Sequence, residues 1–280
     1  LVTSLNSIHG SVEHLHRYAL AKQITKDKIV LDIASGEGYG SFLLSNDAKK
    51  VYGVDIDLES VEHAKKKYAN SKNLEYLCGS TSKIPLPDHS IDVVVSFETI
   101  EHHDQHDMMM QEILRVLKED GYLLISSPEK SIYKRRDPNN PFHIKELSFD
   151  EFKNLINKYF KNSHFFIQKF IIGSLIHSHE SNTVSNFKMF DGNYSEIKEG
   201  VIEEDHFYNQ PFFNLAICSN AELSNIPFVY FSTFNGVNVV KKEIASLKAE
   251  KNIILNSISF KIANKIVSKF SFLKKLFIKI

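Results

Sequence analysis

The sequence predicts an α/β fold: a doubly wound, mostly parallel seven-stranded sheet with helices on both faces, followed by a C-terminal helical tail. Three observations predict it. Apolar segments alternate with amphipathic segments at the spacing of βαβ units. The segment "IDVVVSF" has the β-branched composition of a central strand. The first predicted strand runs into a glycine-rich turn, which is typical of a strand that ends beside a ligand.

Seven strands are expected, and each is short, apolar and bounded by turn residues. Five of them alternate with helical segments and should form the parallel part of the sheet in a Rossmann-like arrangement. The last two follow the fifth helical segment and complete the sheet. The predicted strands are 28–34, 51–55, 74–78, 91–97, 122–126, 164–170 and 213–218.

The helices between these strands are predicted from apolar residues at helical spacing and from capping residues. Asp57, Asp104 and Ser148 are the expected N-caps of the third, fourth and fifth helices, and Gly121 is expected to end the fourth. The predicted helices are 9–23, 39–45, 58–68, 104–117 and 148–160.

Two regions of the chain differ in character. Residues 1–232 are expected to form one domain, in which the polar and poorly periodic segment 171–211 is an insertion or a lid. Residues 233–280 are expected to form a helical extension. This extension ends in a basic amphipathic helix, because lysines alternate with apolar residues over 260–280 and no acidic residue follows Lys251.

Composition limits the class of protein. The 34 basic and 34 acidic residues balance, which gives no reason to expect a nucleic-acid partner. The two cysteines lack metal-ligand spacing and favour a reduced cytoplasmic setting. Residues 1–21 lack the apolar core of a signal peptide, and no apolar run is long enough to span a membrane. The sequence leaves the oligomeric state open.

The turn in "VLDIASGEGYG" carries the first functional signal. Gly36, Gly38 and Gly40 allow tight turning and close approach of another molecule. A phosphate-binding P-loop is excluded, because no Gly-Lys-Ser/Thr follows. A dinucleotide-binding turn would place a third glycine where Ser41 stands. Asp32 precedes the turn, and Asp55 ends the second strand, where a carboxylate can accept the hydroxyl protons of a ribose.

This pattern resembles the class I S-adenosylmethionine (SAM)-dependent methyltransferases. The stretch "CGSTSKIPLPDHSIDVVVSFETIEHH" is similar to the family segment that meets the adenine and then lines the methyl-transfer site, with Ser80 where Asp is usual. "EHLHRYALA", residues 13–21, and "NPFHIKELSFDEF", residues 140–152, resemble segments in methyltransferases of bacterial surface-polysaccharide (O-antigen type) gene clusters. The resemblance covers about residues 12–220.

The resemblance implies SAM as the cofactor and assigns residues to it. The turn would hold the methionine part, Asp55 the ribose, and Ile56 with Ser80 the adenine. Residues 13–21 resemble a leader helix of that group, and Arg17 and Tyr18 either contact the methionine end or only pack this leader helix. The residues expected at the cofactor are Tyr18, Asp32, Ala34, Gly36, Gly38, Asp55, Ile56, Ser80, Thr81 and Glu98.

Two histidines are the expected catalytic residues. Methyl transfer to a hydroxyl needs an aligned nucleophile and a base, and histidine suits that role near neutral pH. His102 and His143 are the candidates, with a structural role as the alternative for each. His102 and His106 could instead share a metal ion, but a polar helix start is favoured there, and no metal is predicted.

The acceptor is predicted from the resemblance alone: an oxygen of a sugar or glycan, such as a lipid-linked sugar, in bacterial surface-polysaccharide biosynthesis. Residues 133–136, "YKRR", could bind its phosphate or sugar oxygens. The basic tail over 260–280 is expected to contact the anionic inner face of the membrane. The alternatives are a methyltransferase for a small molecule or quinone-like acceptor and a non-catalytic subunit that binds SAM or a partner.

Overall fold

The computed structural model describes residues 8–136, 140–169, 190–192, 202–204, 212–223 and 246–257. The chain divides into two compact units, one covering 9–231 and the other made mainly of 232–280. In the second unit the described residues form a helix over 246–256. The expected insertion 171–211 contributes two short described strands, β7 (Phe190–Gly192) and β8 (Ile202–Glu204), which pair antiparallel. The basic tail over 260–280 lies outside the described residues.

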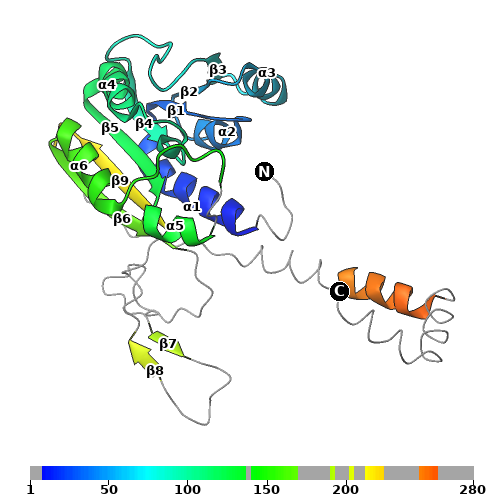
Figure 1. The fold of residues 1–280 in the computed structure, drawn as a ribbon. Helices are drawn as coiled ribbons and strands as arrows, with labels where there is room; N and C mark the ends of the chain where they lie inside the picture. Colours follow the sequence, from blue (N-terminus) through cyan, green and yellow to red (C-terminus); the bar gives the residue numbers. More distant parts are fainter. Residues whose placement is uncertain are drawn as a thin grey trace, which may run out of the picture. The chain divides into compact units, whose positions relative to one another are not determined.

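The first unit is built around a seven-stranded sheet with the order β3-β2-β1-β4-β5-β9-β6 (Figure 1). Strands β1 to β5 run parallel, and β9 pairs antiparallel with both β5 and β6. The seven-stranded, mostly parallel sheet predicted from sequence is therefore confirmed. Its strands are β1 (Ile29–Ile33), β2 (Lys50–Asp55), β3 (Leu74–Cys78), β4 (Ile91–Ser96), β5 (Leu117–Pro128), β6 (Asn162–Gln168) and β9 (Phe213–Ser219).

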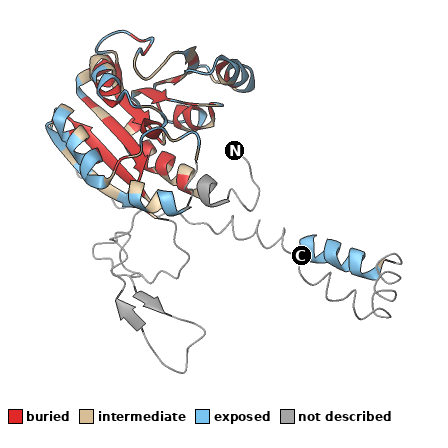
Figure 2. Ribbon diagram, in the orientation of Figure 1, coloured by how far each residue is buried: buried red, intermediate tan, exposed pale blue. Residues whose placement is uncertain are grey.

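Helices cover both faces because the strands are apolar on both sides (Figure 2). Along β4, Val94 packs with one core cluster and Val93 and Val95 with the other. The first cluster includes residues of α4 and α6, and the second includes residues of α1 and α2. The helices are α1 (Ile8–Thr25), α2 (Tyr39–Ser45), α3 (Leu58–Lys67), α4 (His106–Val116), α5 (Lys130–Arg136) and α6 (Phe149–Tyr159).

The helix ends test the predicted caps. Asp57 accepts the backbone N–H groups of Glu59 and Ser60, and Ser148 forms a capping box with Glu151. The prediction that Asp104 caps α4 is wrong. The cap position is Gln105, whose side chain makes no capping bond, because the short 3₁₀ turn η2 (Ile100–His102) delays the start of α4.

This topology fixes where a ligand can bind. The strand order reverses between β1 and β4, and ligands of open α/β sheets bind beyond the carboxyl ends of the strands at such a reversal. The glycine turn follows β1 and the segment 97–103 follows β4, so both predicted site segments meet at this edge. None of the described helices is long and apolar enough to cross a membrane.

Candidate active site at the carboxyl edge of the sheet

The glycine turn after β1 is held in an unusual backbone conformation. Ala34, Gly36 and Gly38 have φ angles of 60°, 51° and 81°, in the left-handed region that favours glycine. Ala34 adopts it without being glycine, which marks stored backbone strain of the kind found at functional sites.

The two central glycines of the turn serve different purposes. A Cβ at Gly38 would collide with the ring of Tyr76, whose hydroxyl donates to the Gly38 carbonyl at 2.6 Å. A Cβ at Gly36 would meet no atom within 4 Å. Gly38 is therefore required for packing inside the fold, whereas Gly36 leaves open space at the surface of the turn. That open space is where a ligand can approach the backbone closely.

Asp55 at the end of β2 is tied directly to the turn. Its Oδ2 accepts the N–H of Gly36 at 2.7 Å, and its Oδ1 accepts the N–H of Asp57 at 2.9 Å. The carboxylate is half-buried, and each oxygen keeps a further lone pair for a ribose hydroxyl. The structure thus brings together the two features on which the cofactor prediction depends, because β1 and β2 are paired neighbours.

The predicted cofactor residues fall into two groups by exposure. One group reaches the surface of the carboxyl edge, where Ile56 is 74% exposed beside Asp55. An exposed apolar side chain at this point can cover a flat heterocyclic base. The surface group comprises Ala34, Gly36, Asp55, Ile56, Ser80, Thr81 and Glu98. The buried group comprises Tyr18, Asp32 and Gly38.

The buried residues stabilise the segment that carries the turn through hydrogen bonds to Asp32. Ser41 donates to Asp32 Oδ2 at 2.7 Å, and the Tyr18 hydroxyl donates to Oδ1 at 3.2 Å. Burial raises the pKa of Asp32 to about 6, although the hydrogen bonds from Ser41 and Tyr18 pull it down. Ser41, which stands where a dinucleotide turn would have its third glycine, is therefore a partner of the buried carboxylate.

Arg17 on α1 is buried and does not reach the surface of the turn. It donates to Gln168 at 2.8 Å, lies 3.6 Å from the Glu98 carboxylate, and stacks over the ring of Phe213 at 4.7 Å. Of the two roles considered for Arg17, these contacts match packing of the leader helix. The Ser126 hydroxyl bonds Glu98 Oε1 at 2.6 Å.

The histidines after β4 differ sharply in role. His106 is buried, and its Nε2 donates to the carbonyls of Ile100 and His103. Burial lowers the pKa of His106, which favours the neutral ring. The metal site considered for His102 and His106 has no support, because backbone carbonyls occupy the Nε2 of His106 and the possible metal ligands that lie near His102 among the described residues are Glu101 and His143. His103 contacts Thr81 at 3.4 Å.

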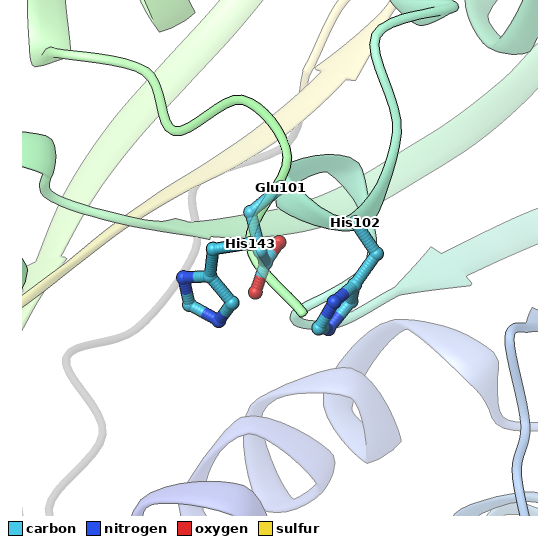
Figure 3. Close-up of side chains that lie close together, drawn as sticks. All are labelled: Glu101, His102 and His143. Atoms are coloured by element: carbon cyan, nitrogen blue, oxygen red, sulfur yellow. The ribbon is translucent and has the colours of Figure 1, made fainter. Parts of the chain in front are cut away.

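His102 and His143 meet although 40 residues separate them (Figure 3). Their ring centroids lie 5.2 Å apart, edge to face. His102 Nδ1 donates to the carbonyl of Phe142 at 2.8 Å, and His143 Nδ1 pairs with Glu146 at 2.8 Å. Tyr133 stacks on the His143 ring at 4.7 Å. With both Nδ1 atoms engaged, each neutral ring keeps a lone pair on Nε2 that can accept a proton.

Two acids complete this cluster and were missed by reasoning from sequence. Glu101 lies between the two imidazoles in Figure 3 and is 1% exposed. Burial raises the pKa of Glu101 well above its usual range, and the neighbouring Glu98 carboxylate adds to the effect. Glu146 orients His143. The sequence "ETIEHH" places Glu101 directly before His102, but nothing in the sequence linked either residue to Glu146.

A cavity of about 270 Å³ opens beside His143. Its lining is largely polar and carries three lysines: Lys130, Lys134, Asn140, His143, Ile144, Lys145 and Glu146. Of the predicted basic segment 133–136, Lys134 lines this cavity. The histidine cluster therefore borders a positively charged space on one side.

SAM fits the residues at this edge. The open face of Gly36 admits close contact with a ligand, the Asp55 oxygens can accept ribose hydroxyls, and Ile56 can cover a base. SAM would supply an electrophilic methyl group there, and Gly36, Asp55 and Ile56 are the residues that would hold it.

Comparisons with known proteins agree with this geometry. Residues 31–125 match the model of the methyltransferase domain family. A probable SAM-dependent methyltransferase of Mycobacterium tuberculosis is 38% identical over 129 residues, which cover 45% of this chain and 46% of that protein. A fatty-acid O-methyltransferase of Mycolicibacterium smegmatis is 27% identical over 121 residues, covering 40% and 44%. The chain thus spans about half the length of these relatives.

A solved structure shares the fold. A Thermotoga maritima protein described as a SAM-dependent methyltransferase, possibly for histamine N-methylation, superposes with a TM-score of 0.53 at 20% identity, covering 76% of this chain and 92% of that one. At that identity the likeness shows the fold. Residues 31–125 are therefore similar to the methyltransferase domain family, and the sheet that contains them has the Rossmann-like fold of class I methyltransferases.

Proposed function

We propose that this chain transfers the methyl group of SAM to an oxygen of a sugar or glycan acceptor, with surface-polysaccharide assembly as its setting. The observation that carries the oxygen acceptor is the pair of imidazoles, His102 and His143, each with Nδ1 engaged and with no hydrogen bond at Nε2 among the described residues. A hydroxyl must lose a proton as it attacks the methyl carbon, and a free imidazole nitrogen can take it.

The cavity supports a polar acceptor. Three of its seven lining residues are lysines, and one, Ile144, is apolar. Lysines at such a wall favour an acceptor that carries phosphate or carboxylate groups beside its hydroxyls. A quinone with an apolar chain offers no charged group to these ammonium groups, of which Lys130 also lies 3.3 Å from the Glu151 carboxylate. The choice of a sugar as acceptor rests on the resemblance of residues 13–21 and 140–152 to methyltransferases of surface-polysaccharide gene clusters. The relatives named above do not support a sugar acceptor.

A second candidate acceptor is a carboxylate, as in the relative that methylates fatty acids. The lysine-lined cavity favours it, because a carboxylate pairs with ammonium groups. The two acceptors place different demands on the site. A carboxylate is already deprotonated at neutral pH and needs no base, whereas a sugar hydroxyl does.

The test is methyl transfer from radiolabelled SAM by the full chain. The acceptors are lipid-linked glycan, nucleotide sugar, fatty acid and quinone extracts. With a hydroxyl acceptor, His102→Ala and His143→Ala should each lower turnover roughly 100-fold while SAM affinity, measured by calorimetry, changes little. Labelling of fatty acid that survives both substitutions would replace the sugar acceptor with a carboxylate. SAM binding without labelling of any acceptor would support the non-catalytic alternative.

Peripheral membrane contact through the basic tail stays part of this proposal. The support is the sequence pattern of 260–280, in which lysines alternate with apolar residues. Deletion of 258–280 should move the protein from sedimenting anionic vesicles into the supernatant. Equal sedimentation of both forms would remove the membrane contact.

A further inference from the structure

The cluster between η2 and the loop 140–147 has the composition of a metal site. One donor atom from each of Glu101, His102 and His143 lies within 4.8 Å of the donor atoms of the other two. Ligands on a tetrahedral ion with bonds of about 2.1 Å are roughly 3.4 Å apart. Closing that difference needs a small shift of the side chains, and the ring of His102 is exposed.

The hydrogen bonds that the Nδ1 atoms of His102 and His143 make are of the kind that metal-binding histidines make. A metal-bound histidine almost always donates its other ring N–H to a carboxylate or a backbone carbonyl, which fixes its tautomer. His143 Nδ1 pairs with the Glu146 carboxylate, and His102 Nδ1 donates to the Phe142 carbonyl. Both rings are thus arranged to offer Nε2 to a shared partner.

Glu101 provides an independent observation. Its side chain is buried between the imidazoles, and its Oε2 has no hydrogen-bond partner among the described residues. A buried carboxylate oxygen without a partner is costly. Glu146, which pairs with His143 at 2.8 Å, places a second carboxylate beside the cluster. A cation at this point would pair with the free oxygen and balance the excess of acids.

We propose that Glu101, His102 and His143 bind one divalent transition-metal cation, of the Zn²⁺ or Mn²⁺ kind. Two imidazoles with one carboxylate suit such ions, whereas Mg²⁺ and Ca²⁺ prefer oxygen ligands alone. Three protein ligands leave a position open for a further oxygen. The site borders the lysine-lined cavity, since His143 belongs to both.

The role of the ion rests on the proposed function. An acceptor hydroxyl bound at the open position becomes more acidic. Its oxygen then attacks the methyl carbon, the C–O bond forms as the C–S bond breaks, and the proton passes to water. The products are the methyl ether and S-adenosylhomocysteine. In this case the two histidines hold the ion and do not themselves remove the proton.

The test measures metal binding without an acceptor. The full chain is stripped with a chelator and titrated with Zn²⁺ by calorimetry, and with Co²⁺, whose visible absorption reports its ligand geometry. The matched variants are His102→Ala, His143→Ala and Glu101→Gln, with His63→Ala, an exposed histidine on α3, as the control. Loss of a ligand should weaken binding at least about 100-fold, and His63→Ala should bind as the parent does.

Folding of each variant is checked by thermal unfolding with and without Zn²⁺. The parent and His63→Ala should gain stability with the ion, and the three cluster variants should not. Binding of one equivalent that survives in both histidine variants would overturn the site, as would Mg²⁺ binding as tightly as Zn²⁺. Because no acceptor is used, this result is separate from the methyl-transfer assay. Full turnover by the metal-free protein would leave the histidines as bases and remove the catalytic role of the ion.

Discussion

Under the proposed function the carboxyl edge has a cofactor side and an acceptor side, and the two are built in different ways. The cofactor side, after β1 and β2, is made of backbone: a left-handed glycine turn fastened to the Asp55 carboxylate. The acceptor side, after β4 and in the loop 140–147, is made of side chains that meet across about 40 residues. A glycine turn can be recognised from a short stretch of sequence. Side chains that meet in space from distant segments cannot.

This difference has a consequence for specificity. A turn built from backbone can hold one ligand in many related proteins, because its shape depends on few side chains. The acceptor side depends on Glu101, His102, His143 and Glu146, and no hydrogen bond among the described residues links these four side chains to the turn. Substitutions on the two sides should therefore separate cofactor affinity from turnover.

The largest expected effect compares two glycines of the turn. Gly38→Ala forces a Cβ into the Tyr76 ring at a positive φ, and should cost about 2–4 kcal/mol of unfolding free energy. Gly36→Ala meets no atom and should cost only about 1 kcal/mol, for the left-handed backbone. Urea unfolding measures the free energies, and calorimetry with SAM measures the affinity.

The SAM affinity of the folded Gly36→Ala variant distinguishes a role in packing from a role in ligand contact. Gly36→Ala should remain folded and still lose SAM affinity, because its new methyl group occupies the open space of the turn. If Gly36→Ala bound SAM as tightly as the parent, the open space would not be the cofactor side of the site.

The second prediction concerns the buried acid beneath the turn. Burial raises the pKa of Asp32 to about 6 in the folded protein, from 3.8 in the unfolded chain. The folded state therefore holds the proton more tightly. The stabilisation is complete below pH 3.8 and is lost as the pH rises through 6, by about 3 kcal/mol.

The measurement is urea unfolding from pH 4 to 7.5 with Asp32→Asn alongside. The amide does not titrate, yet its carbonyl can still accept from Ser41. The difference in stability between the parent and Asp32→Asn should shift in favour of the variant by about 2 kcal/mol across that range, because part of the effect lies below pH 4. A difference that does not change with pH would show that Asp32 is ionised at an ordinary pKa.

The third prediction tests the hydrogen bond between Asp55, at the end of β2, and the glycine turn that follows β1. Asp55→Ala removes the charged acceptor of the Gly36 N–H and the oxygens expected at the ribose. SAM affinity should fall about 30-fold, equivalent to about 2 kcal/mol. Asp57→Ala is the control, since it removes the cap of α3 at a cost of about 1 kcal/mol and leaves the Asp55 carboxylate in place. Equal loss of affinity in both variants would point to general damage at the end of β2.

The sequence predicted the seven strands and the pairing of the turn with Asp55, because local patterns determine both. Alternating apolar segments define strands, and glycines with a preceding Asp32 mark a turn. The cap of α4 was misplaced because Asp104 has the right residue type, but the turn η2 displaces the helix start. Helical spacing offered His106 as a companion of His102, although a polar helix start was favoured there. The ring that lies beside His102 is that of His143, from a distant loop that no periodicity links to η2.

The smallest expected effect tests the acceptor side through Glu146. Glu146→Gln keeps the shape of the side chain but replaces the carboxylate that orients His143 with an amide. Turnover should fall roughly 10-fold, because the imidazole loses its fixed tautomer, while the dissociation constant for SAM stays unchanged. Glu62→Gln, an exposed acid paired with Lys65 on α3, is the control and should alter neither quantity. A loss of SAM affinity in Glu146→Gln would mean that the two sides are coupled, and would break the separation between a backbone-built cofactor site and a side-chain-built acceptor site.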